Sequence, residues 1–166
     1  VRYSLTTADY VSEFSLRPIV LVRNVFDVVM SLLDHHRMET TVYPMAYVPK
    51  DIVEWEFERA ADFVVKMVVP WYFNFFVSWR ECEEKIIVTY EDLNSDVLAT
   101  VQNICKVLNI DVSSSDIENA LALVETMTTR RNQMVIGRGV KLPEAYKERI
   151  VEMASFYKDV DFSIMG

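Results

Sequence analysis

Residues 18–33, PIVLVRNVFDVVMSLL, decide the fold of this chain. The apolar, β-branched run Ile19–Val22 predicts a short strand that is buried on both faces. It leads within two residues into a stretch whose apolar side chains recur every three or four positions, which predicts a helix of about three turns. A buried strand that passes directly into a helix is the first half of a βαβ unit. The stretch therefore predicts an α/β protein with a parallel sheet.

The rest of the chain repeats this alternation of strand and helix. Residues 85–90 predict a second strand, residues 91–96 a turn, and residues 97–108 an amphipathic helix. Two strands among many helices indicate a helix-rich α/β protein with a single domain over residues 1–166. Either its sheet is small, or further strands lie upstream of Val1. Four more helices are predicted: from Asp51 to about Pro70, over 71–80, after a capping box at Ser115, and with Pro143 in the first turn.

The composition excludes several classes of protein. The chain has 166 residues, a net charge of −8 and only three glycines, which excludes the glycine-rich phosphate loops. An acidic chain is a poor partner for nucleic acid. Two cysteines without metal-ligand spacing predict no disulfide framework, which fits a reducing, cytoplasmic location. The most apolar stretch, residues 64–77, is interrupted by Lys66, Pro70 and Asn74, so we predict no membrane-spanning segment.

Arg23 and Ser31 are candidate ligands of a phosphate group. Arg23 lies at the carboxyl end of the first predicted strand, where open α/β sheets bind ligands, and a guanidinium can donate two parallel bonds to phosphate. Ser31 follows a little over two helical turns later, so its hydroxyl points back toward Arg23. The helix N-terminus adds free N–H donors. The alternative interpretation is that Arg23 pairs with Asp27 and that Ser31 is an ordinary helix serine.

Three further groups of charged residues each have two interpretations. Residues 130–149 hold six basic residues against two acidic ones, which suits either a small anion or a solvated helix face. The run 34–36, Asp-His-His, matches a metal-dependent phosphoesterase motif but lacks the further aspartates that this chemistry needs, so a role at the helix end is favoured. Glu91 and Asp92 could form an acid/base pair, but a capping or turn role is favoured because adjacent residues on a turn point apart.

Three blocks of the sequence resemble the sulfotransferases that use 3′-phosphoadenosine 5′-phosphosulfate (PAPS). Residues 23–31, RNVFDVVMS, are similar to the family's R-N-P-x-D-x-x-x-S segment, with Val25 in place of the usual proline. Residues 85–96, KIIVTYEDLNSD, are similar to the family's strand that ends in Y-E-D-L-x-x-D. Residues 137–139, GRG, resemble a late R-K-G or G-R-G element. The blocks occur in the family's order, and the resemblance covers most of the chain from Arg17 onward.

The resemblance implies a P-loop-NTPase-like sulfotransferase fold and a reaction without a metal. A sulfuryl group would pass from PAPS to a hydroxyl or amine of a small-molecule or glycan acceptor. By resemblance, Arg23 and Ser31 bind the 3′-phosphate, and Arg138 and Gly139 close over it. Tyr90 would lie near the adenine.

Part of the family's pattern is missing. The family's N-terminal strand–loop–helix, which holds the 5′-phosphosulfate, has no counterpart before Arg17. We therefore expect a 3′-phosphate half-site without the transfer half-site, and no catalytic residue is assigned. The alternative is a non-catalytic module that lacks the transfer half-site: a protein that binds adenosine bisphosphate, or a helical interaction module. A nucleoside phosphate kinase is disfavoured, because it needs a glycine-lysine loop. The loop 39–49 and the helix 71–79 are expected to line the acceptor pocket.

Overall fold

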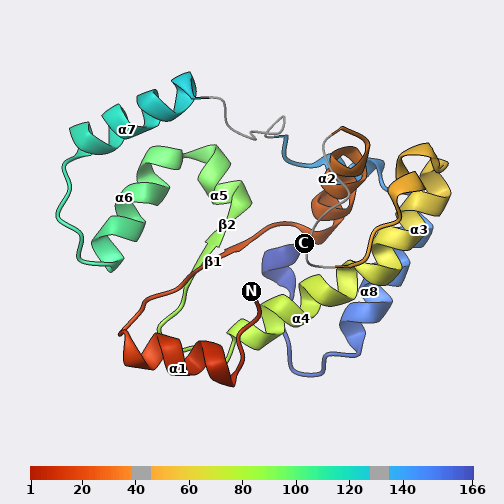
Figure 1. Cartoon of the computed structure of the whole chain (residues 1–166), viewed down its shortest axis with the longest axis horizontal. Coiled ribbons are helices and arrows are strands. Elements are labelled where there is room, and N and C mark those ends of the chain that lie inside the picture. Colours follow the sequence, from red (N-terminus) through yellow and green to blue (C-terminus); the bar gives the residue numbers. More distant parts are fainter. Residues whose placement is uncertain (39–45, 128–134) are drawn as a thin grey trace.

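The structure is a computed structural model, and it describes residues 1–38, 46–127 and 135–166 (Figure 1). Helices dominate these ranges, as predicted. In chain order the elements are α1 (Leu5–Glu13), β1 (Ile19–Val22), α2 (Val25–Met38), η1 (Lys50–Glu54), α3 (Phe57–Met67), α4 (Val69–Trp79), β2 (Ile86–Thr89), α5 (Tyr90–Ser95), α6 (Val97–Val107), α7 (Ser114–Thr126), η2 (Arg138–Lys141), α8 (Glu144–Ser155) and η3 (Ser163–Met165), where η marks a 3-10 helix.

The two predicted strands are confirmed and pair in parallel. Their register joins Ile19 to Ile86 and Val22 to Thr89, so both strands end at the same edge of the sheet. The prediction that the first strand is buried on both faces is wrong. Its side chains alternate: Val20 and Val22 are buried, whereas Leu21 is 47% exposed. Val88, the register partner of Leu21 on the same face, is 8% exposed, so within the described ranges that face is covered over β2 and open over β1. The shared edge brings together the residues that follow the two strands.

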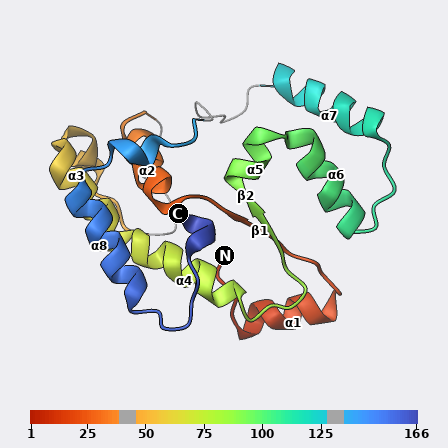
Figure 2. The ribbon, with the colours of Figure 1, turned by 180° about the vertical axis from the view of Figure 1, so that it is seen from behind.

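Helices α2, α3, α4 and α8 form the main body, on the side of the sheet that holds Val20 and Val22. In Figure 2, α8 runs beside α3 and α4, which follow one another end to end, and all three lie away from α6 and α7. The core joins the inward strand residues to the apolar stripes of these helices: Val20, Val22, Val29, Leu33, Ala61, Val64, Val65, Val69, Phe73, Phe76 and Ile150. The helix that starts with Pro143 is confirmed, since Pro143 is the N-cap of α8. This packing fixes the place where β1 passes into α2.

The helical segment divides into two helices near Pro70, as predicted, with the boundary at Val68. α3 ends at Met67 and α4 begins at Val69, with Val68 between them in a helical conformation. Pro70 lies in the first turn of α4, where a missing N–H breaks no helical bond. By length and composition alone, Phe57–Trp79 is a weak candidate for a membrane span. Half of its most apolar stretch is buried inside the protein. The burial of these side chains in the core explains their apolar character.

Several predicted helix starts are shifted. The helix expected at Asp51 begins at Phe57 instead, and Asp51 lies in η1. The capping box of α7 uses Ser113 with Asp116, not Ser115. The turn predicted over residues 91–96 is mostly the short helix α5. Only the shift from Ser115 to Ser113 is a choice between neighbouring residues that can both cap a helix.

Candidate functional site

Arg23 and Tyr90 meet at the shared end of the two strands. Each residue follows the last residue of its strand, and those last residues, Val22 and Thr89, are register partners. The guanidinium carbon of Arg23 lies 4.2 Å from the centroid of the Tyr90 ring. This is the geometry of a cation–π contact. The structure therefore brings together two of the residues that the sequence singles out.

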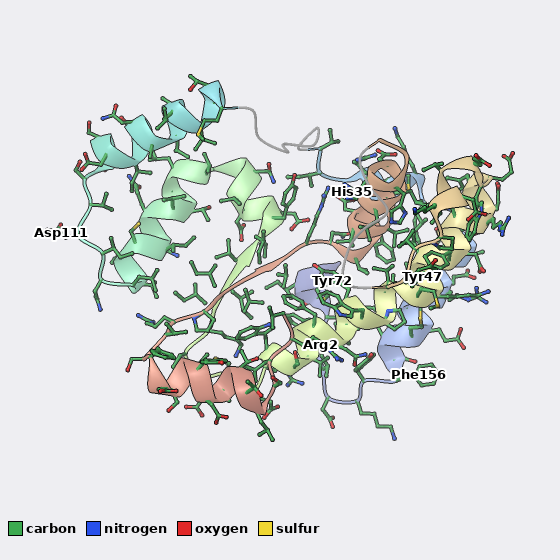
Figure 3. All side chains as sticks on the ribbon, in the orientation of Figure 1. Arg2, His35, Tyr47, Tyr72, Asp111 and Phe156 are labelled. Atoms are coloured by element: carbon green, nitrogen blue, oxygen red, sulfur yellow. The ribbon has the colours of Figure 1, made fainter. Side chains whose placement is uncertain are left out.

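A tyrosine that the sequence analysis missed holds the backbone of Arg23. The Arg23 N–H donates to the Tyr72 hydroxyl at 2.7 Å, and that hydroxyl donates to the Arg23 carbonyl at 2.9 Å. Tyr72 projects from α4 toward the end of β1 (Figure 3). Burial raises the pKa of Tyr72 to about 12, so its proton is present at neutral pH. In the sequence, Tyr72 lies in an aromatic stretch that indicates a place in the core, and nothing there points to a role at Arg23.

The guanidinium of Arg23 is only partly satisfied. Its Nη2 donates to the carbonyl of Val135 at 2.9 Å and lies 3.6 Å from Oδ2 of Asp27. The expected alternative, a pair between Arg23 and Asp27, is therefore present. Its Nε is buried and has no hydrogen-bond partner among the described residues. A buried donor without an acceptor costs about 1–3 kcal/mol, so this atom marks a place where an acceptor group would be stabilised.

Asn24 and Glu91 join the two strand ends. The side-chain oxygen of Asn24 accepts from the N–H groups of Phe26 at 3.0 Å and Asp27 at 3.2 Å, which caps α2. The Asn24 N–H donates to Oε1 of Glu91 at 3.1 Å. Glu91 thus fastens the start of α5 to the start of α2.

Asp92 lies in the first turn of α5, whose N-cap is Thr89. Its carboxylate accepts from the Thr89 hydroxyl at 2.6 Å, and its N–H donates to the same hydroxyl at 3.0 Å. Glu91 has a different partner: its carboxylate accepts a hydrogen bond from the N–H of Asn24, at the start of α2. The two carboxylates therefore act separately, and the acid/base pair is not formed.

Asp27 ties the late glycine segment to α2. Its side chain is 1% exposed, and its two oxygens accept from the N–H groups of Gly137 at 2.8 Å and Gly139 at 2.6 Å. The sequence analysis considered Asp27 only as a partner of Arg23. Its distant partners lie more than a hundred residues along the chain, and no local spacing signals them.

The two glycines of this segment have separate structural reasons. Gly137 has φ +82°, a left-handed conformation that favours glycine. Gly139 has no room for a side chain, because a Cβ there would lie 2.4 Å from Cβ of Phe26. Of the two uses expected for Gly139, a turn or a close backbone approach, the structure gives it a close approach to α2.

Ser31 is a residue of α2, and the side chain of Arg138 packs against the same helix. The guanidinium of Arg138 forms an ion pair with Asp34, and the Arg138 side chain is 14% exposed. Asp27, Ser31 and Asp34 are spaced four and three residues apart, so they share one stripe of the helix. Ser31 is half-buried, and its hydroxyl has no hydrogen bond within the ranges that the structure describes. Ser31 therefore lies on α2 between the two carboxylates that engage the segment 137–139.

Two other basic residues of the late segment form ion pairs of their own. Arg149 pairs with Asp62 of α3, and Lys147 pairs with Glu144. The Arg149 pair fits the solvated-face interpretation, whereas Lys147 also lines a pocket with Asn24, Asp27, Gly137 and Gly139. Two further arginines of that stretch, at 130 and 131, lie outside the described residues, as does most of the predicted acceptor loop 39–49.

The Asp-His-His run shows no sign of a metal centre. Within the described ranges, no group of three or more possible metal-ligating side chains is found. His36 is 3% exposed, and burial, together with neighbouring His35, lowers its pKa to about 4. His36 is therefore neutral at pH 7, and a charged role at the helix end does not apply to it.

Comparisons with known proteins bear on the fold and the family of the chain. No curated protein matches the chain. Among solved structures, the chain is similar to mouse sulfotransferase SULT7A1 complexed with PAP, with a TM-score of 0.70 and 16% sequence identity. The match covers 93% of this chain and 63% of the other, and at that identity it shows a shared fold. A family model described as the sulfotransferase domain matches residues 7–156. Because this match takes in most of the chain, the protein belongs to the sulfotransferase family.

Proposed function

We propose that the site at the strand ends binds the adenosine 3′-phosphate part of PAPS. The observation that carries this proposal is Arg23, which stacks on Tyr90 with its Nε buried and unpartnered among the described residues. A phosphate oxygen is a strong acceptor for such a donor. The N-terminus of α2 adds a positive dipole end beside it. The solved neighbour is complexed with PAP, which supports a nucleotide of this kind as the ligand.

Each predicted ligand has a role in this proposal. Arg23 and Ser31 bind the 3′-phosphate, the latter with a hydroxyl that has no other use among the described residues. Tyr90 contacts the adenine with the ring face or edge that Arg23 leaves open. Arg138 adds a second guanidinium and Gly139 sets its approach. The phosphate shares these guanidinium groups with Asp27 and Asp34. Because its attraction to them is between charges, which salt screens, the affinity for the nucleotide should fall as ionic strength rises.

The reaction follows from the donor. In the transfer, a bond from sulfur to the acceptor oxygen or nitrogen forms while the bond between sulfur and the phosphate oxygen breaks. Adenosine 3′,5′-bisphosphate leaves with the electron pair of the broken bond, and the acceptor's proton passes to water. Residues of this chain hold the donor at its phosphate and its base, which fixes the direction of the phosphosulfate. No metal takes part in the proposed reaction. The acceptor is a small molecule or glycan with a hydroxyl or amine.

Calorimetry with two nucleotides tests the proposal. Adenosine 3′,5′-bisphosphate (PAP) should bind more tightly than adenosine 5′-monophosphate (5′-AMP), because only PAP carries the 3′-phosphate. Arg23→Ala should weaken PAP binding roughly tenfold or more, since a charge-assisted contact contributes about 1.5–3 kcal/mol. Arg149→Ala is the matched control, because Arg149 pairs with Asp62 instead. Equal affinity for the two nucleotides would refute the proposal.

A non-catalytic nucleotide-binding module is the second candidate. One observation favours it: the described residues that converge at the strand ends have structural partners or suit a nucleotide, and none is placed as a base for an acceptor. Incubation with PAPS carrying labelled sulfate and a mixture of phenols, amines and glycans distinguishes the two. Labelled product indicates a transferase, and binding without product indicates the module.

A further inference from the structure

We propose that Asp27 is a positioning residue for the 3′-phosphate site. Its carboxylate holds residues 137–139 (the glycine turn) against α2, an arrangement that we call the clamp, and so orients Arg138 and Arg23 toward the phosphate. This inference rests on the proposed nucleotide site. Asp27 does not touch the ligand in this scheme. It acts through backbone N–H groups that lie 110 and 112 positions later in the chain.

The clamp uses both oxygens of one buried carboxylate. One oxygen accepts a hydrogen bond from the N–H of Gly137 and the other from the N–H of Gly139, so the residue between the two glycines is held on both sides. That residue is Arg138. A carboxylate that is 1% exposed needs such donors, because a buried charge without hydrogen bonds is strongly disfavoured. The two backbone hydrogen bonds therefore allow the carboxylate of Asp27 to be buried, and its burial makes the loss of either bond costly.

The clamp also decides how the turn can contribute to anion binding. Glycine turns often bind phosphate with their N–H groups. Here the N–H groups of Gly137 and Gly139 donate to Asp27, so both glycine N–H groups are engaged and the charge that the turn offers a phosphate is the side chain of Arg138. This explains why an acidic residue stands in the centre of a site for an anion.

The position of Arg138 along α2 follows from the clamp. The backbone on each side of it is held at the level of Asp27, and its guanidinium reaches Asp34, seven residues further along the helix. The side chain of Arg138 thus runs along the stripe that contains Ser31. The contact of Gly139 with Phe26 leaves the turn no freedom to slide closer to the helix.

Asp27 bears on Arg23 as well. Its Oδ2 lies 3.6 Å from Nη2 of Arg23, the same oxygen that accepts from Gly137. A single carboxylate therefore fixes the relative positions of the two guanidinium groups proposed to bind the 3′-phosphate.

The test compares Asp27→Asn with the natural chain in PAP and 5′-AMP binding. An amide keeps one acceptor but turns an NH2 toward the second backbone N–H, so one half of the clamp opens. We expect the preference for PAP over 5′-AMP to fall roughly tenfold, with 5′-AMP affinity changed by less than about twofold. Asp116→Asn is the matched control: it removes a capping carboxylate of α7 and should leave the preference intact.

A second variant keeps the proposal falsifiable if Asp27→Asn does not fold. Gly137→Ala meets no atom within 4 Å, but it strains a left-handed turn, so it loosens the clamp without altering Asp27. It should also lower the preference for PAP. Each result then has one meaning. If the natural chain shows no preference for PAP, the proposed function fails. If that preference exists and both variants keep it, or if Asp27→Asn weakens both nucleotides equally, the positioning role is overturned.

Discussion

The Tyr72 hydroxyl accepts a hydrogen bond from the N–H of Arg23 and returns one to the carbonyl of the same residue. This residue stands at the end of β1, where the strand's own ladder stops. A hydroxyl from α4 thus replaces the strand partner that the backbone of Arg23 lacks. The core helix therefore sets the direction in which the proposed phosphate ligand leaves the sheet.

Replacement of this tyrosine should cost stability. In Tyr72→Phe, the N–H and carbonyl of Arg23 lose their partner in a partly buried place, which should lower the free energy of unfolding by about 1–3 kcal/mol. Urea denaturation measures this change. Tyr157→Phe is the control, because its hydroxyl bonds to Asn74 at an exposed site and should matter less. Equal losses in the two variants would show that the Tyr72 hydroxyl does not support Arg23.

The strand–helix unit and the place of Arg23 at the end of a strand could be predicted from the sequence. Both follow from local patterns of apolar residues. The contact of Arg23 with Tyr90 was not predicted, although each residue comes directly after a strand and parallel strands end at one edge. The roles of Asp27 and Tyr72 could not be predicted. Their partners are far away in the chain, and an aspartate in a first helical turn or a tyrosine in an apolar helix has an ordinary local explanation.

The exposure of Leu21 was missed for a related reason. A run of four β-branched or apolar residues predicts burial on both faces, but the run alone does not tell what covers each strand. Leu21 is half-exposed while its register partner Val88 is buried, so within the described ranges this face is covered over β2 and open over β1. What covers a strand is a property of tertiary packing, which periodicity does not report.

The buried His36 predicts a pH dependence of stability. Its pKa falls from 6.5 to about 4 in the folded chain, so the unfolded chain binds a proton first as pH decreases. The stabilising contribution is complete above pH 6.5 and is lost as pH falls toward 4. Between pH 6.5 and 5 we expect a loss of at least about 1 kcal/mol in the free energy of unfolding.

A pair of variants isolates this effect from the carboxylates. His36→Gln should flatten the pH dependence between pH 6.5 and 5, because glutamine does not titrate. His35→Gln, which changes the other of the two histidines, should keep most of it. Denaturation curves at several pH values provide the comparison. If His36→Gln retains the full slope, another group is responsible for it.

Asp34 should act as a competitor of the nucleotide for Arg138. Its carboxylate forms an ion pair with the guanidinium that is proposed to bind the 3′-phosphate, and it adds a negative charge near that phosphate. Asp34→Asn removes the charge and releases Arg138, so PAP affinity should rise about threefold or more at low salt, and less at high salt. The affinity for 5′-AMP should stay constant. Asp62→Asn is the control, because Asp62 pairs with Lys66 and Arg149 instead. Weaker PAP binding by Asp34→Asn would show the opposite role: the carboxylate would then hold Arg138 in its binding position, and the phosphate would bind beside the ion pair rather than in its place.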